Sequence, residues 1–445
     1  MAGRILIAGT NSGCGKTTVT TAVLSALRAR GERVSAFKCG PDYIDPMFHR
    51  RAIGVPSHNL DPYFSTGDQL RAQLAAADGT GVIEGVMGYY DGIGTGGRAS
   101  TYDVARETGT PVILVVNAKG LYTSAGAILK GFRDFKPKSN MRGVIFNGAT
   151  AMTYQGLAEI AREAGFTAYG FLPRSDEVTV GSRHLGLVTA DEIEDLQNKL
   201  ARLGALAERF IDLDGLLALA AQAAPLTGTP AAPPAEQRVR IAVARDEAFC
   251  FVYAENLELL EALGCGLCFF SPLHDTALPE RIGGLYLPGG YPELYAETLS
   301  ANIAMRTAIQ NAITGGLPTI AECGGFLYLH RTLDGLPMAD AIPAAAYRTE
   351  KLQRFGYIEL TAERDNLFCA AGGLIRAHEF HYYTSEDYGD GFLAVKASGS
   401  RSYSCIHTTK TLYAGFPHLY FPANPRFAER FAEKASDYLK ENGLC

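Results

Sequence analysis

A glycine-rich loop near the start of the chain most strongly constrains its fold. Residues 9–18 read Gly-Thr-Asn-Ser-Gly-Cys-Gly-Lys-Thr-Thr and directly follow an apolar run at 5–8. Such a loop between a buried strand and a helix turns backbone N–H groups toward phosphates, and the helix N-terminus adds its dipole. Lys16 is expected to reach the terminal phosphates of ATP, and the Thr17 hydroxyl to bind Mg²⁺. The residues predicted to hold the nucleotide are Gly13, Gly15, Lys16, Thr17 and Thr18.

Short apolar runs alternate with helical patterns through the first half of the chain. These runs are rich in Val and Ile and do not alternate with polar residues, which is typical of buried parallel strands. Strands alternating with helices predict an α/β fold with a parallel sheet covered on both faces. The expected strands are 5–8, 34–37, 81–83, 112–116 and 143–146, and the expected helices are 17–30, 101–108, 124–132 and 152–164.

A Pro-, Ala- and Thr-rich stretch separates two parts of the chain. It follows a helical pattern at 191–224 that breaks near residues 212–214, and it is the best linker candidate. We therefore expect a P-loop domain at 1–224, a linker at 225–238 and a second α/β domain at 239–445. In the second domain we expect a helix at 256–263, a more antiparallel and aromatic end, and strands at 238–244, 267–270, 284–287 and 319–322.

Acidic residues follow the second and third predicted strands. Asp42 and Asp45 come after the strand 34–37, and Glu84 and Asp91 come after the strand 81–83. In an open parallel sheet, ligands bind at the carboxyl ends of the strands. Because Mg²⁺ prefers hard oxygen ligands, the predicted metal set is Thr17, Asp45 and Glu84. For Asp42 and Asp91, a role in the loop or at a helix cap is an equal alternative.

A cysteine on a glycine-flanked turn marks a second candidate site. Cys323 lies between the apolar run 319–322 and a short helical pattern. A strand, a sharp turn and a helix expose a nucleophile, and the helix N-terminus is expected to lower the pKa of its thiol. The alternative is an inert buried cysteine, the usual state of this residue. The predicted oxyanion or glutamine contacts are Gly289, Gly290 and Gly324, the first two from a Pro-Gly-Gly loop.

A thiol nucleophile needs a base, and the late histidines are the candidates. His418 lies in the segment 415–421 near an expected strand end, and the order cysteine then histidine favours it. For any single histidine, a hydrogen-bonded core or surface position is the alternative. The other candidates are His378, His381 and His407.

Composition limits the partners and the compartment. The 445 residues are 47% hydrophobic and 20% charged, as in a globular protein. A net charge of −6 argues against a general nucleic-acid binder, and the most apolar stretch is too short to span a bilayer. Nine scattered cysteines favour a reducing compartment, so we expect a cytoplasmic protein without nucleic-acid or membrane partners; a homodimer stays open.

Together these segments resemble the cobyrinate a,c-diamide synthase family. In that family a dethiobiotin-synthetase-like, ATP-dependent amidoligase is fused to a class I glutamine amidotransferase domain. The more specific matches are Glu84–Gly92, which reads Glu-Gly-Val-Met-Gly-Tyr-Tyr-Asp-Gly, and His378-Glu-Phe-His381. The resemblance covers nearly the whole chain and includes 9–18, 38–46 with His49, 59–61, 172–174, 184–187, 288–293, 322–329, 378–382 and 415–421.

The resemblance implies a two-stage amidation. ATP phosphorylates a peripheral carboxylate of a corrinoid precursor, and ammonia released from glutamine at the second domain attacks the acyl phosphate. Activation is needed because carboxylate oxygen is a poor leaving group, and a closed path keeps the ammonia unprotonated. The implied cofactors are ATP and Mg²⁺. The implied partners are cobyrinate, or a related tetrapyrrole polycarboxylate, and L-glutamine, with amides formed at the a and c acetates.

The resemblance also implies roles for single residues. Lys38 matches a lysine near the reacting carboxylate and phosphate, so it joins Cys323 and His418 as catalytic. The residues assigned to the substrate are Asp42, Tyr43 and Asp91. The groups expected to bind the other carboxylates of the macrocycle are Arg98, Arg174, Arg183, His184 and His378.

Two positions depart from the related patterns. Ordinary class I amidotransferases carry a glutamate two residues after the histidine, whereas this chain has Tyr420 there. The site is therefore expected to be a Cys323–His418 dyad. Asn117 stands where relatives often have aspartate, so no role is assigned to it.

Three alternative functions compete with this interpretation. A Ni-sirohydrochlorin a,c-diamide synthase would amidate the corresponding acetates of another macrocycle, and the sequence does not exclude it. Cobyric acid synthase shares the two-domain plan but differs in the region 84–92. A non-catalytic regulatory ATPase of the septum-site or partition type would carry a lysine at the position of Asn11 and has no use for Cys323.

Overall fold

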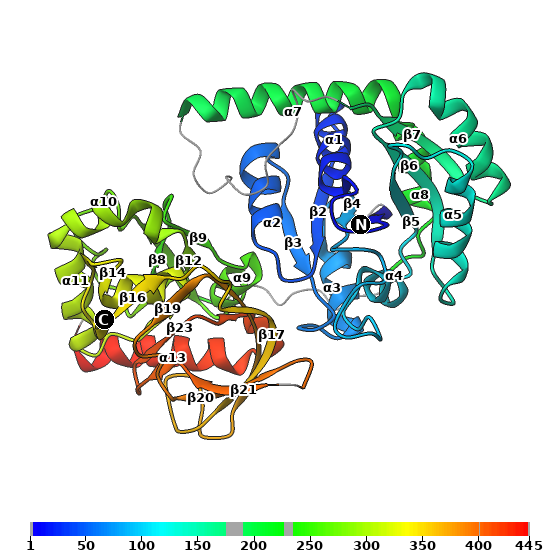
Figure 1. Cartoon of the computed structure of the whole chain (residues 1–445). Coiled ribbons are helices and arrows are strands. Elements are labelled where there is room, and N and C mark those ends of the chain that lie inside the picture. The colour runs from blue at the N-terminus through cyan, green and yellow to red at the C-terminus, as the bar shows by residue number, and fades with distance from the viewer. Residues whose placement is uncertain (1–2, 175–189, 227–234, 400, 444–445) are drawn as a thin grey trace. The chain divides into compact units, whose positions relative to one another are not determined.

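The chain forms two compact units. The computed structural model describes residues 3–174, 190–226, 235–399 and 401–443. Contacts divide the chain into Met1–Ala231 and Ala232–Cys445 (Figure 1). This division falls within the range 225–238 taken above as a linker. Among the described residues, no helix combines the length and the apolar character needed to cross a membrane.

The first unit is built on a seven-stranded sheet in the order β3-β2-β4-β1-β5-β6-β7. All neighbouring strands are parallel, which confirms the predicted α/β sheet. Two strands, β3 and β7, were not predicted. The strands are β1 (Gly3–Gly9), β2 (Val34–Cys39), β3 (Ser57–Leu60), β4 (Thr80–Glu84), β5 (Val112–Asn117), β6 (Met141–Asn147) and β7 (Thr167–Leu172).

Helices cover both faces of this sheet because successive side chains of a strand point to opposite sides. Ile5 and Ile7 of β1 pack with α1, α7 and α8, whereas Leu6 and Ala8 pack with α3 to α6 (Figure 1). The helices are α1 (Lys16–Ala29), α2 (Ile44–Phe48), a π-helix (His49–Ile53), α3 (Gly67–Ala76), α4 (Thr101–Thr108), α5 (Ser124–Asp134), α6 (Ala151–Glu163), α7 (Ala190–Phe210) and α8 (Leu213–Ala221).

The predicted break near residues 212–214 separates α7 from α8. Asp212 caps α8, since its Oδ1 accepts a hydrogen bond from the Gly215 N–H over 2.9 Å. Arg30, the C-cap of α1, joins both helices to the end of α1, because it bonds Glu208 over 2.8 Å and Asp214 over 2.6 Å. The helix that begins at the phosphate loop is thereby held at its far end.

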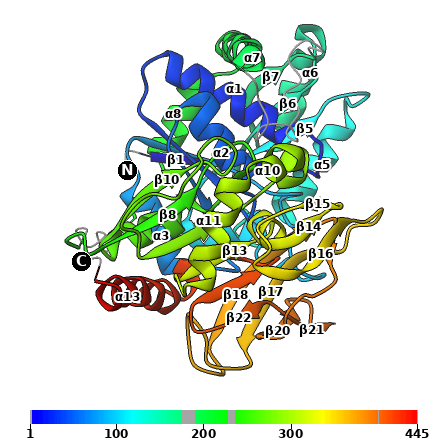
Figure 2. The ribbon, with the colours of Figure 1, turned by 90° about the vertical axis from the view of Figure 1, so that its left-hand side faces the viewer.

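The second unit contains a six-stranded sheet in the order β10-β8-β11-β13-β23-β22, in which β22 alone runs antiparallel to its neighbour. On one face α9 (Ala254–Ala262) and α13 (Arg426–Glu441) pack. On the other lie α10 (Ala296–Ala301), α11 (Ile303–Thr314) and α12 (Gly324–Leu329) (Figure 2). The strands are β8 (Val239–Ala244), β10 (Cys265–Phe270), β11 (Gly284–Leu287), β13 (Thr319–Glu322), β22 (His407–Thr408) and β23 (Leu412–Gly415).

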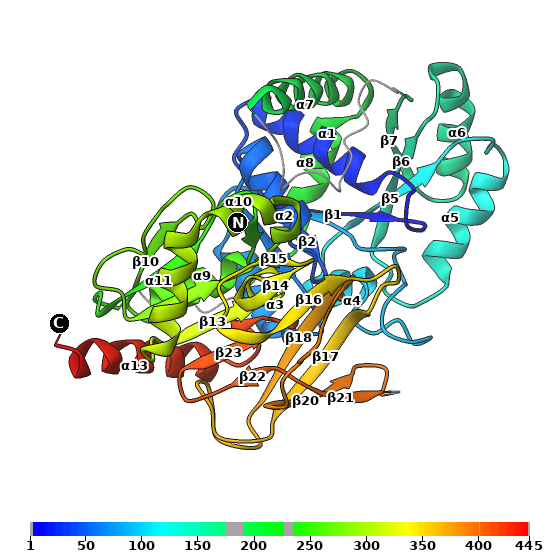
Figure 3. The same cartoon turned by 60° about the vertical axis from the view of Figure 1, so that its left-hand side comes forward.

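The C-terminal part adds antiparallel pairing, as the sequence predicts (Figure 3). A five-stranded sheet has the order β21-β20-β17-β18-β24, a four-stranded sheet has the order β15-β14-β16-β19, and β9 pairs with β12. The strands are β9 (Phe249–Phe251), β12 (Gly289–Gly290), β14 (His330–Leu333), β15 (Leu336–Pro337), β16 (Ile342–Arg348), β17 (Arg354–Ala362), β18 (Leu374–His381), β19 (Tyr383–Ser385), β20 (Phe392–Lys396), β21 (Ser402–Cys405) and β24 (His418–Leu419), with 3₁₀ turns at Pro292–Tyr295 and Phe421–Ala423.

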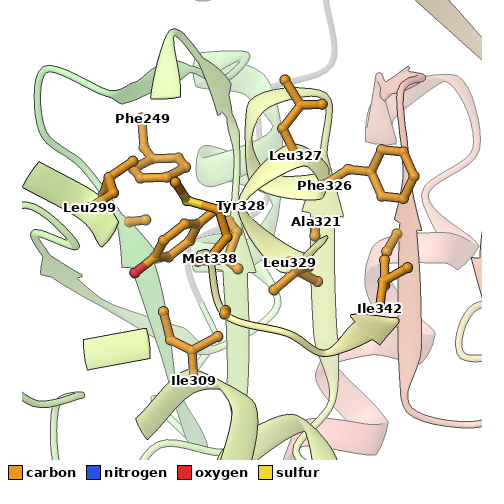
Figure 4. Close-up of a cluster of buried hydrophobic side chains, with 14 of the residues drawn as sticks. Phe249, Leu299, Ile309, Ala321, Phe326, Leu327, Tyr328, Leu329, Met338 and Ile342 are labelled. Carbon is orange, nitrogen blue, oxygen red and sulfur yellow. The ribbon is translucent and has the colours of Figure 1, made fainter. Parts of the chain in front are cut away.

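The short helix α12 is buried along its whole length. Figure 4 shows Tyr328 pointing toward Phe249, Leu299 and Met338, whereas Phe326 points to the opposite side of the helix. The ring centroids of Tyr328 and Phe249 lie 5.4 Å apart. A helix held on all sides in this way fixes the turn that precedes it, and that turn carries Cys323.

Replacing Tyr328 with Phe is expected to stabilise the second unit. The Tyr328 hydroxyl is buried without a hydrogen-bond partner, so its removal ends a desolvation cost. We expect a gain of about 1 kcal/mol, or about 2–4 °C in the midpoint of thermal unfolding measured by calorimetry. Tyr286→Phe is the matched control and should lower the midpoint, because the Tyr286 hydroxyl donates to Glu322 Oε2 over 3.0 Å. A lower midpoint for Tyr328→Phe contradicts this account.

Candidate active sites

The glycine-rich loop connects β1 to α1 in a conformation that only glycine adopts easily. Gly13 has φ 79° and Gly15 has φ 100°, in the left-handed region. A side chain at Gly15 is also excluded by space, because its Cβ would lie 2.0 Å from Asn147 Nδ2. Asn147, at the end of β6, donates a hydrogen bond to the Cys14 carbonyl over 3.1 Å. No motif in the sequence marks Asn147 as part of this site.

Lys16 opens α1 and is buried beneath the loop. Its Nζ donates to the Asn11 carbonyl over 3.4 Å. Burial lowers the pKa of Lys16, against an upward effect of Cys14, Glu84 and Asp45. Thr17 and Thr18 follow in the first turn. The five predicted nucleotide residues thus lie at one helix N-terminus, where backbone N–H groups and the helix dipole favour a phosphate.

A buried cluster of charges lies beside this loop. Lys38, at the end of β2, bonds Glu84 Oε1 at the end of β4 over 2.7 Å and also pairs with Asp45 of α2. The Thr17 hydroxyl donates to the same Glu84 oxygen over 2.6 Å. Residues from two strands and two helices thus meet at the carboxyl edge of the sheet. The structure brings together Lys38, Asp45, Glu84 and Thr17, which the sequence placed in one site.

The cluster carries unequal charges. Burial opposes the charge on Lys38, but Asp45, Glu84 and Asp42 outweigh it and raise the pKa of Lys38 well above its usual value. Burial, followed by the charge of Glu84, raises the pKa of Asp45 well above its usual range. At Glu84, burial is outweighed by Lys38 and His49, which lower the pKa of its carboxyl. Lys38 and Glu84 therefore form the firm ion pair, and Asp45 is the carboxyl that takes up a proton most easily.

The donor set fits Mg²⁺ at Thr17 and Glu84. The Thr17 hydroxyl and a Glu84 oxygen are neighbours, and Glu84 Oε2 is buried without a hydrogen bond. The Lys38 ammonium pairs with both Asp45 and Glu84. Asp45 therefore serves as an ion-pair partner of Lys38 before it serves as a metal ligand. Within the described ranges, no group of three His, Cys, Asp or Glu side chains is placed to hold a metal. Mg²⁺ often takes one or two protein carboxylates and completes its shell with water and substrate phosphates.

His49 is a further member of the charge cluster. The sequence marks it only as part of the motif at 38–49. It is fully buried, with Nδ1 3.2 Å from Ser57 Oγ and Nε2 3.6 Å from Glu84 Oε2. The imidazole therefore lies behind the carboxylate that faces Lys38. Its signal in the sequence is a histidine close after an acidic cluster, which alone does not distinguish a ligand from a core residue.

The residues predicted to contact the substrate lie in loops around this cluster. Asp42 Oδ1 accepts from the Ile44 N–H over 2.8 Å, and Tyr43 directly precedes α2. Asp91 Oδ2 accepts from the Gly88 N–H over 2.9 Å. Asp42 and Asp91 thus have local roles in their turns, which was the alternative considered for them.

The cationic groups predicted for a carboxylate-rich ligand are only partly described. Arg98 and Arg174 are exposed. Arg98 forms an isolated bridge with Ile93, and Arg174 follows β7 beside Gly148. Arg183 and His184 lie outside the described residues.

Cys323 occupies a strained turn between β13 and α12. Its φ is 46°, which is rare for a residue with a side chain and is found at nucleophile elbows. Its N–H donates to the Gly415 carbonyl over 2.8 Å, so the turn is tied to β23. A Cβ on Gly325 would lie 2.1 Å from the Leu287 carbonyl. The elbow thus needs a glycine for its close contact with the neighbouring strand.

The loop 288–290 and His418 approach this elbow. A Cβ on Gly324 would lie 2.8 Å from the Gly290 nitrogen, and one on Gly289 would lie 2.4 Å from His418 Cε1. The structure therefore gathers the predicted oxyanion glycines and the predicted base around the turn of Cys323. No side chain larger than hydrogen fits at Gly289 without moving the imidazole.

The expected lowering of the thiol pKa is wrong for this state of the protein. Burial raises the pKa of Cys323, and the charge of Glu293 acts in the same direction. The Gly324 N–H opposes this rise but does not offset it. Desolvation of the thiolate therefore outweighs the favourable helix terminus, and the thiol needs a base to lose its proton.

The histidine candidates separate by their surroundings. His418 Nδ1 lies 3.7 Å from Glu322 Oε2, and the residue pairs across the strands with His378. His381 stacks on Phe416 with ring centroids 3.8 Å apart, and its Nδ1 is 2.7 Å from the Tyr383 carbonyl. His407 lies near Asp387. His381 and His407 thus have structural partners of their own, whereas His418 lies against Gly289, in the loop that borders the elbow.

Comparisons with known proteins agree with this division of sites. Residues 5–188 match the CobQ/CobB/MinD/ParA nucleotide binding domain, and residues 240–425 match the CobB/CobQ-like glutamine amidotransferase domain. A cobyrinate a,c-diamide synthase of Thermoplasma volcanium is 40% identical, with 99% of each chain covered. The chain belongs to the cobyrinate a,c-diamide synthase family.

Other members of the family are similar over comparable lengths. The synthase of Dehalococcoides mccartyi strain 195 is 37% identical over 96% of this chain and 97% of its own. That of Salmonella typhimurium is 38% identical over 98% of both chains. As a member of the family, the protein is an ATP-dependent ligase that forms amides with glutamine as the amido donor.

Glu293→Gln is expected to change the reactivity of Cys323 only at alkaline pH. Burial raises the pKa of Glu293 to about 7, so its carboxyl is neutral below that pH and charged above it. The charged form raises the pKa of the thiol. The variant should therefore react faster with iodoacetamide than the parent at about pH 8.5 and equally fast at about pH 5.5. Mass spectrometry of the Cys323 peptide measures both rates, and an equal ratio at both pH values contradicts the coupling.

Proposed function

We propose that the protein amidates the a and c acetate side chains of cobyrinate, using ATP and glutamine, through an acyl-phosphate intermediate. The observation that carries this proposal is similarity to cobyrinate a,c-diamide synthases over nearly the whole chain. Both candidate sites support it, since a phosphate loop and a thiol elbow are the parts that activation and ammonia release require. A cytoplasmic location is part of the proposal and is supported by eight free cysteines among the described residues.

In the first unit, the residues of the charge cluster would act on the transferred phosphoryl group. Lys16 and the loop N–H groups hold the phosphates of ATP, and Lys38 stabilises negative charge where the substrate carboxylate meets the phosphorus. Mg²⁺, held by Thr17 and Glu84 with Asp45 nearby, would neutralise the phosphate charge. Lys38 stays charged throughout, because its carboxylate partners raise its pKa.

In the second unit, Cys323 would attack the side-chain amide carbon of glutamine with His418 as base. The carbonyl oxygen would be bound by N–H groups of the turn and of the loop, with Gly289, Gly290 and Gly324 giving the close approach. Release of ammonia then leaves a thioester, which water hydrolyses to glutamate. Ammonia produced in this way replaces ammonium from the medium.

Lys16→Ala and Cys323→Ala form a matched pair that separates the two reactions. Lys16→Ala should abolish amide formation with either nitrogen source while leaving glutamine hydrolysis at least partly intact, because Lys16 acts on phosphates. Cys323→Ala should abolish glutamine-driven amidation and retain amidation with high ammonium, because the thiol only supplies ammonia. Coupled assays for glutamate and for amide test both. If a folded Cys323→Ala variant forms no amide with either glutamine or ammonium, the role of the cysteine is structural.

Mass spectrometry of macrocycles incubated with the protein, ATP, Mg²⁺ and glutamine tests the substrate. Cobyrinate or hydrogenobyrinate should gain two amides, with one ATP consumed for each, because each carboxylate is activated separately. If nickel sirohydrochlorin gains two amides and cobyrinate gains none, the proposed mechanism stands and the proposed substrate is wrong. ATP hydrolysis without amide formation on any of them contradicts the proposed function.

A further inference from the structure

Glu322 is a buried carboxylate directly before the proposed nucleophile. It ends β13 and is 1% exposed. Its Oε1 accepts a hydrogen bond from the Leu419 N–H over 3.0 Å, and its Oε2 accepts one from the Tyr286 hydroxyl over 3.0 Å. The same Oε2 lies 3.7 Å from His418 Nδ1. The carboxylate is thus fixed from two sides and directed at the imidazole.

A buried charge in this position is expensive for the fold. The other residues of β13 are buried and uncharged, and an apolar side chain there would avoid the cost of desolvation. Such groups are retained where they are paired or where a site uses them. Glu322 is also anchored to the residue that follows His418, so carboxylate and imidazole are held by one short stretch of backbone.

Tyr420, at the position where class I amidotransferases usually have a glutamate, makes different contacts. It is buried, and its ring packs edge-on against Tyr253 with centroids 5.2 Å apart. A phenol ring in this setting supplies no negative charge. Any carboxylate beside the base is therefore supplied by another part of the chain.

We propose that Glu322 is the positioning residue of the glutaminase site, orienting His418 through Nδ1 so that Nε2 exchanges protons with Cys323. This rests on the proposed roles of Cys323 and His418. The site is then a triad whose acid stands next to the nucleophile in sequence, in place of a dyad.

The proton balance follows from this arrangement. His418 Nε2 takes the thiol proton as the bond between sulfur and the amide carbon forms, and the Glu322 charge stabilises the imidazolium. The imidazolium gives that proton to the departing nitrogen as the C–N bond breaks, which releases ammonia. Water then loses a proton to His418 as it attacks the thioester, and that proton returns to the sulfur. Glu322 neither takes up nor gives up a proton in this cycle.

The groups around the imidazole are compatible with this cycle. His378 is the cross-strand partner of His418, and burial, with smaller effects of His418 and Lys396, lowers its pKa to about 3. His378 is therefore neutral near pH 7 and does not repel an imidazolium beside it. Glu293 acts electrostatically on Cys323, and the Glu322 carboxylate lies within ion-pair distance of His418.

The test compares Glu322→Gln, Glu322→Asp and Tyr420→Phe in the full-length chain, by steady-state glutamine hydrolysis. Glu322→Gln keeps the shape and removes the charge, so its kcat should fall by about 100-fold or more while KM changes less than about threefold. Glu322→Asp keeps the charge at a greater distance from His418, so its kcat should lie between that of Glu322→Gln and that of the parent. Tyr420→Phe should match the parent. Circular dichroism and thermal unfolding confirm the fold of each variant.

The pH profile separates positioning from a structural role. Without the neighbouring charge the imidazolium is less favoured, so the acid limb of kcat/KM should move to lower pH in Glu322→Gln as the plateau drops. A folded Glu322→Gln variant with parent-like kcat, or a lower plateau with an unmoved acid limb, overturns the proposal. If Glu322→Gln does not fold, a parent-like kcat in Glu322→Asp overturns it equally.

Failure of the proposed function gives a different result. In that case the parent itself hydrolyses no glutamine, or Cys323→Ala and His418→Ala hydrolyse it at the parent rate. If both of these variants are inactive and Glu322→Gln is active, the proposed function stands and only the role of Glu322 is lost.

Discussion

The buried ammonium of Lys38 is the interaction on which the first unit depends. A lysine without water must be paired, and the two carboxylates that pair with it come from β4 and α2. Lys38 and Glu84 are also direct neighbours in the register of β2 and β4. Because the Thr17 hydroxyl bonds the same carboxylate, the start of α1 is aligned with the strand ends. One ion pair thus joins the ends of β2 and β4 to the start of α1, directly after the phosphate loop.

In the second unit, backbone contacts hold the turn that carries Cys323. The Cys323 turn is tied to β23 through Gly415, and its glycines bring it against the neighbouring strand and loop. The buried helix α12 then prevents the turn from relaxing. The buried side chains that pack around this short helix support the strained turn (Figure 4).

The sequence predicted the parts of the fold that rest on strong apolar patterns. The runs at 5–8 and 112–116 are strands because no polar residue interrupts them, and the phosphate loop follows from its glycines. The apolar patterns do not predict β3, because Ser57–Leu60 reads Ser-His-Asn-Leu; its Ser57 hydroxyl lies 3.2 Å from Nδ1 of His49, beside the charge cluster. The sequence did not point to Glu322 for a similar reason, because its proposed role depends on His418 of β24, which is distant in sequence but close in space. Propensity describes neighbours along the chain, whereas these roles come from neighbours in space.

The raised pKa and 9% exposure of Cys323 affect how readily its thiol is oxidised. Peroxide and other oxidants react with the thiolate, so a shielded thiol that keeps its proton is oxidised slowly. A thiol of this kind becomes a strong nucleophile only when a base removes its proton. Burial of the Cys323 thiol is therefore expected to slow its oxidation without any covalent modification.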